Sequence, residues 1–178
     1  KGNPKSRERV FIVHRLDREV SGILVFARSE AAKISLQGQW SDVEKRYLAL
    51  VHGRPKSDEG VFTSYLVEHG VHKVQSTRDK SRGKLSETGY TVIGHSDGVS
   101  LLDVHLLTGR KHQIRVHLAE NDLPILGDKK YGEGNDGVRR LALHAKSIAF
   151  EHPYSGERCF FETRVPHLFA RYGGEGGD

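Results

Sequence analysis

A carboxylate surrounded by cations lies near the start of the chain, in residues 13–22 (VHRLDREVSG). Asp17 has His14, Arg15 and Arg18 as neighbours and stands just before an apolar run. Nearby cations lower the pKa of a carboxyl group and keep it ionised, as a nucleophile or a base requires. Loops at strand ends are also where a rigid scaffold usually displays reactive groups. The alternative is a structural Asp–Arg pair, which the spacing alone favours.

A second polar cluster occupies residues 107–117 (LTGRKHQIRVH), where a helix is predicted to begin. The free backbone N–H groups and the dipole at a helix N-terminus favour an anion. A phosphate group or the Asp17 carboxylate would suit this position. The candidate binding residues here are Arg110, Lys111, His112 and Arg115.

Three histidines close to this cluster raise the question of a metal site. They are His105, His112 and His117. Their spacing matches no zinc pattern such as HExxH, and the single cysteine, Cys159, is remote in sequence. We therefore expect no metal site.

A third segment places Lys45, Arg46 and Tyr47 at the mouth of an apolar strand, LALV. Such a tyrosine could stack against a nucleic-acid base while the flanking cations bind phosphate. Equally, Tyr47 could be a core residue with its hydroxyl at the surface. A fourth segment, residues 140–145 (RLALHA), is an apolar run with one histidine, and its pattern alone indicates core.

The composition is that of a globular protein, with 178 residues, 36% hydrophobic and 29% charged. This length predicts one compact domain over residues 1–178. No apolar run approaches the roughly 20 residues that span a bilayer, and no signal-peptide pattern is present, so we expect no membrane association. A single cysteine excludes an internal disulfide framework and favours a reducing cytoplasm. The chain has no methionine, so we expect that residue 1 is not the start of translation and that an N-terminal part is missing.

Positive charge is concentrated in three parts of the chain. The formal net charge is +5, which suggests a polyanionic partner but does not require one. The cationic residues gather in residues 1–9, 73–84 and 110–115. Each cluster alone is consistent with a solvated loop. Three such clusters in one small domain favour nucleic acid.

Hydrophobic patterning predicts a strand-rich chain with few helices. Strands are expected at residues 22–27, 46–51, 61–67, 90–93, 99–107, 148–150 and 158–162, with a short one near Val74. Helices are expected from Glu30 toward Trp40, over residues 113–120, and after Pro166. The first strand is a continuous apolar run suited to a buried position, and Ser29 can cap the first helix.

Turns and loops complete this prediction. Asp97 and Gly98 form a hairpin turn of the Asp-Gly kind. Residues 1–9 are predicted to be a loop, residues 71–86 a polar and flexible segment, and residues 173–178 a tail. Frequent hairpins indicate the α+β class, with a mixed, mostly antiparallel sheet flanked by helices and loops.

Five motifs, in order and in approximate spacing, resemble the RluA-type pseudouridine synthases. They are HRLDxxxSG at residues 14–22, the KxYLALV-like strand around Tyr47, TGRxHQIRxH at 108–117, PIxGDxxYG at 124–132 and LxLHA at 141–145. The resemblance runs from about Val10 to Pro166. It implies the pseudouridine synthase catalytic fold and an isomerase that acts on uridine in structured RNA, either ribosomal or transfer RNA.

The resemblance also implies roles for matching residues. Asp17 would be the catalytic aspartate, Arg115 would keep it charged and aimed, and Tyr47 would stack on the target uracil. Arg15 would enter the RNA stack in place of the flipped base, and Leu143 would add an apolar wall. The remaining residues expected to contact RNA are His14, Lys45, Arg46, Arg110, Lys111 and His112.

No cofactor is expected, because isomerising uridine needs neither a redox step nor a metal. A monomer without an obligatory protein partner is the default expectation. The family's usual strand and KPxG-like element before HRLD are absent, which fits the expected missing N-terminal part. Whether an S4-type domain belongs to the protein, and whether Asp17 acts covalently or through a glycal, stay open.

Two other classes of function compete with this interpretation. A non-catalytic RNA-binding module would be expected to lack Asp17, Tyr47 or Arg115, and all three are present. A hydrolase of glycosidic bonds usually needs a second carboxylate as general acid, which none of the motifs supplies in an obvious way.

Overall fold

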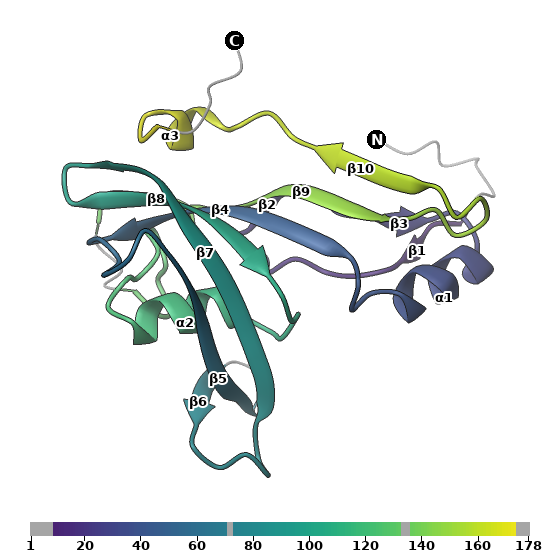
Figure 1. Ribbon diagram of the computed structural model, residues 1–178, viewed down its shortest axis with the longest axis horizontal. Coiled ribbons are helices and arrows are strands. Elements are labelled where there is room, and N and C mark those ends of the chain that lie inside the picture. Colours follow the sequence, from purple (N-terminus) through teal and green to yellow (C-terminus); the bar gives the residue numbers. More distant parts are fainter. Residues whose placement is uncertain (1–8, 71–72, 133–135, 174–178) are drawn as a thin grey trace.

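The computed structural model describes residues 9–70, 73–132 and 136–173, and its centre is one large sheet (Figure 1). Its strand order is β10-β9-β4-β8-β7-β5-β6, with β2 paired to β9. All pairs are antiparallel except β2 with β9. The strands of this sheet are β2 (Ser21–Gly22), β4 (Glu44–His52), β5 (Glu59–His69), β6 (Lys73–Thr77), β7 (Lys84–Ser96), β8 (Val99–Leu106), β9 (Leu143–Glu151) and β10 (Arg158–Glu162).

Smaller elements surround this sheet. They are a two-stranded sheet of β1 (Phe11–Ile12) and β3 (Phe26–Ala27), and the helices α1 (Glu30–Gly38), α2 (Gln113–Glu120) and α3 (His167–Ala170). In Figure 1, α2 and α3 lie on opposite sides of the large sheet. The α+β class with a mostly antiparallel sheet is therefore confirmed. The single-domain organisation over residues 1–178 stays a prediction.

Several local predictions are confirmed because they rest on short-range chemistry. The Ser29 hydroxyl accepts the N–H of Ala32 and caps α1 at the predicted position. The helix predicted over residues 113–120 is α2. Asp97 and Gly98 both have positive φ, 52° and 73°, as a tight turn between β7 and β8 requires.

The single buried strand predicted over residues 22–27 is wrong. The segment divides into β2, in the large sheet, and β3, in the small one, and Phe26 is 47% exposed. Gly22 pairs with β9 at φ 109°, and a Cβ there would collide with the carbonyl of Ala145. The chain then leaves the sheet, and the N–H of Val25 donates to the His14 ring instead of to a strand. Apolar runs of this length do not reveal such a crossing between sheets.

The main core lies around the middle of the large sheet. Leu48, Leu101 and Leu102 are fully buried there, together with Leu118 from α2. Phe169 from α3 joins the same cluster. This packing fixes α2 against the sheet and so sets where its first turn points.

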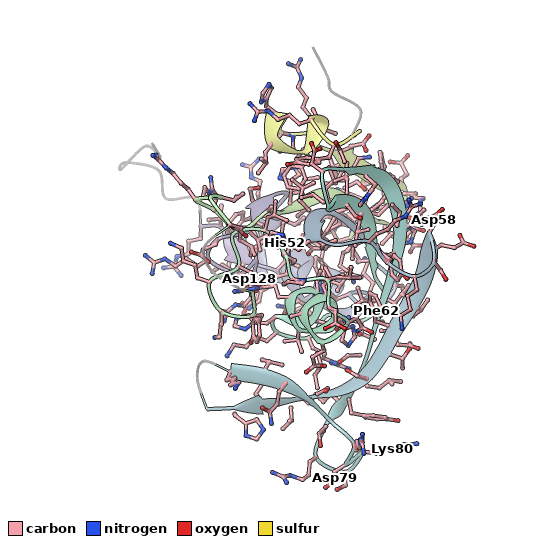
Figure 2. The ribbon with its side chains drawn as sticks, turned by 90° about the vertical axis from the view of Figure 1, so that its left-hand side faces the viewer. His52, Asp58, Phe62, Asp79, Lys80 and Asp128 are labelled. Carbon is pink, nitrogen blue, oxygen red and sulfur yellow. The ribbon has the colours of Figure 1, made fainter. Side chains whose placement is uncertain are left out.

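The strands β5, β6 and the first part of β7 extend away from the body as an arm (Figure 1). Figure 2 shows Asp79 and Lys80 at the far end of this arm and Asp128 within the body. The predicted cationic cluster at residues 73–84 belongs to the arm. A short strand near Val74 is confirmed as β6. Of the cluster at residues 1–9, only Arg9 falls within the described residues, as does only Gly173 of the predicted tail.

None of the helices in the described ranges combines the length and the apolar character that crossing a bilayer demands.

Candidate active site

A pocket of about 310 Å³ opens between the loop after β1, the start of β4 and the first turn of α2. This volume is in the range of small-ligand sites. Residues from four distant parts of the sequence meet in it. The predicted site residues that line it are His14, Arg15, Asp17, Lys45, Tyr47, Arg110, His112, Arg115 and Leu143.

Asp17 and Arg115 face each other across this pocket, although they lie 98 residues apart in the chain. Arg115 Nη1 is 3.4 Å from Asp17 Oδ2. The side chain of Asp17 is 20% exposed, whereas that of Arg115 is only 6% exposed. The ion pair is therefore covered on the arginine side and open to the pocket on the aspartate side.

Asp128 holds the other edge of the same guanidinium, a contact that the sequence analysis missed. Arg115 donates from Nε to Asp128 Oδ2 at 2.8 Å and from Nη2 to Oδ1 at 2.7 Å. Burial alone would lower the pKa of Arg115, but its bonds to Asp128 and the charge of Asp17 raise it above the ordinary value. Asp128 stands in the GDxxYG part of a quoted motif, and that was its only signal in the sequence.

His112 lies near the other oxygen of Asp17. Its Nε2 is 3.8 Å from Asp17 Oδ1, and its Nδ1 is 2.8 Å from the hydroxyl of Tyr131. Burial lowers the pKa of His112, against the opposing charge of Asp17, while Arg115 lowers it further. Tyr131, also missed from the sequence, lies under the guanidinium with its ring 5.1 Å away.

The pocket wall beside Asp17 is aromatic and apolar. Tyr47, on β4, belongs to the buried core and also lines the pocket. Its position therefore fits the core alternative and leaves its ring available to a base in the pocket. Burial raises the pKa of its phenol to about 12, and the charge of Asp17 adds to the shift. Leu143, with Leu106 and Val20, supplies apolar surface.

Two residues predicted to contact RNA are built into the wall around Trp40. The Nε2 of His14 accepts the N–H of Val25 at 3.0 Å, and its ring lies 4.6 Å from the Trp40 ring. Lys45 is buried and donates to the Trp40 carbonyl at 2.9 Å. Burial lowers the pKa of both residues. Their contact with RNA stays a prediction, and their visible role is to shape the pocket.

The other predicted RNA contacts lie at the rim or outside the pocket. Arg46 forms a two-point ion pair with Asp103, at 3.2 and 3.1 Å, beside a neighbouring hollow. Arg110 lies on the rim, where its Nε is 3.4 Å from the carbonyl of Leu85. The Nζ of Lys111 is 3.3 Å from Glu68 Oε2, and Lys111 borders a wider hollow that Asp17 also lines.

That wider hollow, of about 580 Å³, adjoins the pocket and is rich in cations. We call it the basic groove. Arg15 and Asp17 line both spaces, so the two are continuous at these residues. The cationic side chains of the basic groove come from Arg15, Arg18, Lys111, Arg115, Lys129 and Lys130.

The sequence is similar to a protein-family model and to several curated proteins. Residues 1–120 match the family model described as RNA pseudouridylate synthase. An uncharacterized RNA pseudouridine synthase of Mycobacterium tuberculosis is 41% identical over 166 residues, which cover 89% of this chain and 54% of that protein. The ribosomal large subunit pseudouridine synthase C of Vibrio parahaemolyticus is 38% identical over 164 residues, covering 87% and 51%.

Solved structures that resemble this chain are also pseudouridylate synthase domains. The human RNA pseudouridylate synthase domain containing 1 has a TM-score of 0.79 at 29% identity, over 91% of this chain and 71% of that one. The present chain spans about half the length of the curated relatives that it matches. The family match, the relatives and the shared fold agree with the order of motifs around Asp17, and the chain belongs to the RluA-type family of RNA pseudouridine synthases.

Proposed function

We propose that this chain isomerises uridine to pseudouridine in structured RNA, with Asp17 as the catalytic group. The observation that carries the proposal is the Asp17 carboxylate, 20% exposed at a pocket and 3.4 Å from a buried guanidinium. Relatives named as ribosomal large subunit pseudouridine synthases favour large-subunit ribosomal RNA as the substrate.

The reaction breaks the bond from N1 of uracil to C1′ of ribose and forms a bond from C5 to C1′. N1 gains a proton and C5 loses one, so atoms and electrons balance without an oxidant. Asp17 either attacks as a nucleophile or removes the proton from C2′, and both routes need an ionised carboxylate. Arg115 places a positive charge 3.4 Å from Asp17 Oδ2. The walls of the pocket retain the detached base while it turns.

The target base must leave its stack to reach Asp17, because the pocket admits one base and not a paired stem. Flipping costs a few kcal/mol. Stacking on Tyr47 offsets part of this cost. Arg15 lies where the pocket meets the basic groove, a position from which its guanidinium can fill the gap in the RNA. The cations of the basic groove bind the phosphates on either side.

A glycosidic hydrolase is a weaker proposal on this geometry. Among the described residues that line the pocket, Asp17 is the sole carboxylate. Asp128 shares Arg115 with Asp17, but it is 1% exposed and engaged with that guanidinium. Burial would raise the pKa of Asp128, yet its bonds to Arg115 and to backbone N–H groups bring it below the ordinary value. A carboxylate held in this state does not supply the proton of a general acid.

The test compares wild type with Asp17→Asn on large-subunit ribosomal RNA transcripts carrying tritium at C5 of uridine. We expect tritium release by the wild type and none by the variant, with similar RNA affinity for both. Asp58→Asn is the matched control, because its carboxylate is 70% exposed, pairs with Arg54 and lies outside the pocket lining. Undiminished release by Asp17→Asn would remove this residue from the mechanism.

Product analysis separates the competing reactions. An isomerase returns intact RNA with a carbon-linked nucleoside, whereas a hydrolase leaves free uracil and an abasic site. Transfer RNA transcripts form a second arm of the experiment. A wild-type chain that binds both RNAs and modifies neither contradicts the proposal and favours a non-catalytic RNA-binding module.

A further inference from the structure

Both residues that approach Asp17 are held from behind by one short turn, residues 128–131, which we call the positioning turn. Asp128 Oδ1 accepts the backbone N–H groups of Lys130 and Tyr131, at 2.9 and 3.0 Å. The same carboxylate binds Arg115 with both of its oxygens. The conformation of the turn and the position of the guanidinium therefore depend on one buried group.

Asp128 fixes the orientation of the Arg115 guanidinium. A guanidinium is planar and rigid, with its donors in a fixed fork. Nε and Nη2 are engaged by Asp128, and Nη1 is left to face Asp17 Oδ2 at 3.4 Å. With two of its nitrogens fixed, the third has little freedom. Asp128 thus aims the charge of Arg115 at one oxygen of Asp17.

Tyr131 orients His112 in a similar way, through a hydrogen bond to its ring. Its hydroxyl oxygen accepts the N–H of Val74 at 3.1 Å, which leaves its own proton to donate to His112 Nδ1 at 2.8 Å. A neutral imidazole that accepts at Nδ1 carries its proton on Nε2. Nε2 is the ring nitrogen that lies 3.8 Å from Asp17 Oδ1, so this proton would be on the nitrogen near the carboxylate. The opposite tautomer would direct a lone pair at the carboxylate.

The positioning turn is itself firmly anchored. Asp136 accepts the backbone N–H groups of Gly127 and Val138, and its carboxylate lies 3.3 Å from His52 Nε2. Gly127 has φ 73°, and a Cβ there would collide with the carbonyl of Arg140. The turn therefore has the rigidity that an orienting support needs.

We propose that Asp128 and Tyr131 are positioning residues, which act through Arg115 and His112 to direct one N–H at each oxygen of Asp17. This inference rests on the proposed function for its catalytic consequence. Its structural content, a neutral His112 with the proton on Nε2, does not depend on turnover.

The first test is 15N NMR of the imidazole groups at neutral pH, with the His112 signals assigned by their loss in a His112→Gln variant. We expect the Nε2–H tautomer in the wild type. In Tyr131→Phe, which keeps the ring over Arg115 and removes only the hydroxyl, we expect a mixture of tautomers. A wild-type His112 that is protonated on Nδ1, or doubly protonated, overturns the proposal even if the chain has no activity.

The second test measures the single-turnover rate and the RNA dissociation constant separately. In Tyr131→Phe and Asp128→Asn, we expect the rate to fall by about 10- to 100-fold, as for other groups that orient a reactive side chain. RNA affinity should stay within about twofold, because neither side chain reaches the pocket lining. The matched controls are Tyr154→Phe and Asp58→Asn, both exposed and absent from the pocket lining.

The outcomes are distinguishable. Inactive wild type contradicts the proposed function, while the NMR result still decides the orientation of His112. Wild-type turnover in Tyr131→Phe overturns the positioning role whatever tautomer is found. Asp128→Asn removes a buried charge and can unfold the chain, so Tyr131→Phe, checked by its melting temperature, is the deciding variant.

Discussion

Replacing Arg115 by methionine is the sharpest test of how the site is held together. One guanidinium contacts two carboxylates, so its removal takes the nearest positive charge from both. The side chain of Asp128 is 1% exposed and that of Asp17 is 20% exposed. Water can reach Asp17 but not Asp128. The loss of stability on removing Arg115 should therefore come mainly from the buried charge of Asp128.

The expected loss follows from that burial. Removing one partner of a buried ion pair costs about 3–5 kcal/mol, because the other charge stays buried and uncompensated. In the wild type the pKa of Asp128 is below its ordinary value, so this carboxylate stabilises the fold at neutral pH and less so in acid. Without Arg115, only the two backbone N–H bonds oppose the effect of burial, so we expect the pKa of Asp128 to rise. Protonation of Asp128 at low pH then removes the buried charge. The difference in the free energy of unfolding between wild type and variant therefore shrinks as the pH falls toward about 4.

Urea denaturation of wild type and Arg115→Met, at neutral pH and at about pH 4, measures this difference in the free energy of unfolding. The control is Arg54→Met, which breaks an exposed pair with Asp58, the two side chains being 56% and 70% exposed. It should cost about 0–1 kcal/mol at both pH values. Adding Asp128→Leu to Arg115→Met should restore part of the stability, since no buried charge then remains. A small, pH-independent loss in Arg115→Met would refute this reasoning.

Three further predictions concern other parts of the site. Gly22→Ala should prevent or strongly destabilise folding, as seen by circular dichroism, because its Cβ meets a β9 carbonyl. Arg18→Ala and Lys129→Ala should each weaken RNA binding and make its dependence on log salt shallower by about 1, if each contacts one phosphate. Tyr47→Phe should remove a phenol with a pKa of about 12 from the alkaline absorbance titration. A Tyr47 signal at the ordinary tyrosine position would contradict its burial beside a carboxylate.

Sequence patterns predicted those features whose causes are local. The Ser29 cap, the turn at Asp97 and Gly98, and the limits of α2 depend on neighbouring residues, and all are confirmed. The specific pairing of Asp17 with Arg115, 98 residues apart, was expected through the family resemblance. The residue pattern alone offered Asp17 as one of two anions that would suit the helix start. Nothing in the local spacing connects these two residues.

Features set by long-range contacts were not predictable in this way. The apolar run after Asp17 was read as one strand, although pairing of Gly22 with β9 and its positive φ divide it between two sheets. Local spacing gave no sign that Lys45 is buried and donates to the carbonyl of Trp40, and its predicted contact with phosphate stays a prediction. Asp128 and Tyr131 had no assigned role because their partners lie on α2 and just before it.

The two carboxylates that share Arg115 are suited to different tasks. Asp128 has both oxygens occupied by charge-assisted bonds of 2.7 and 2.8 Å and by two backbone N–H groups, so few lone pairs remain for reaction. Asp17 meets the same guanidinium at 3.4 Å through one nitrogen and stays open to the pocket. The looser contact leaves the oxygens of Asp17 accessible from the pocket, as its proposed role as nucleophile or base requires. A single arginine can therefore hold one aspartate as a support and leave the other reactive, and the difference between them is set by burial and distance.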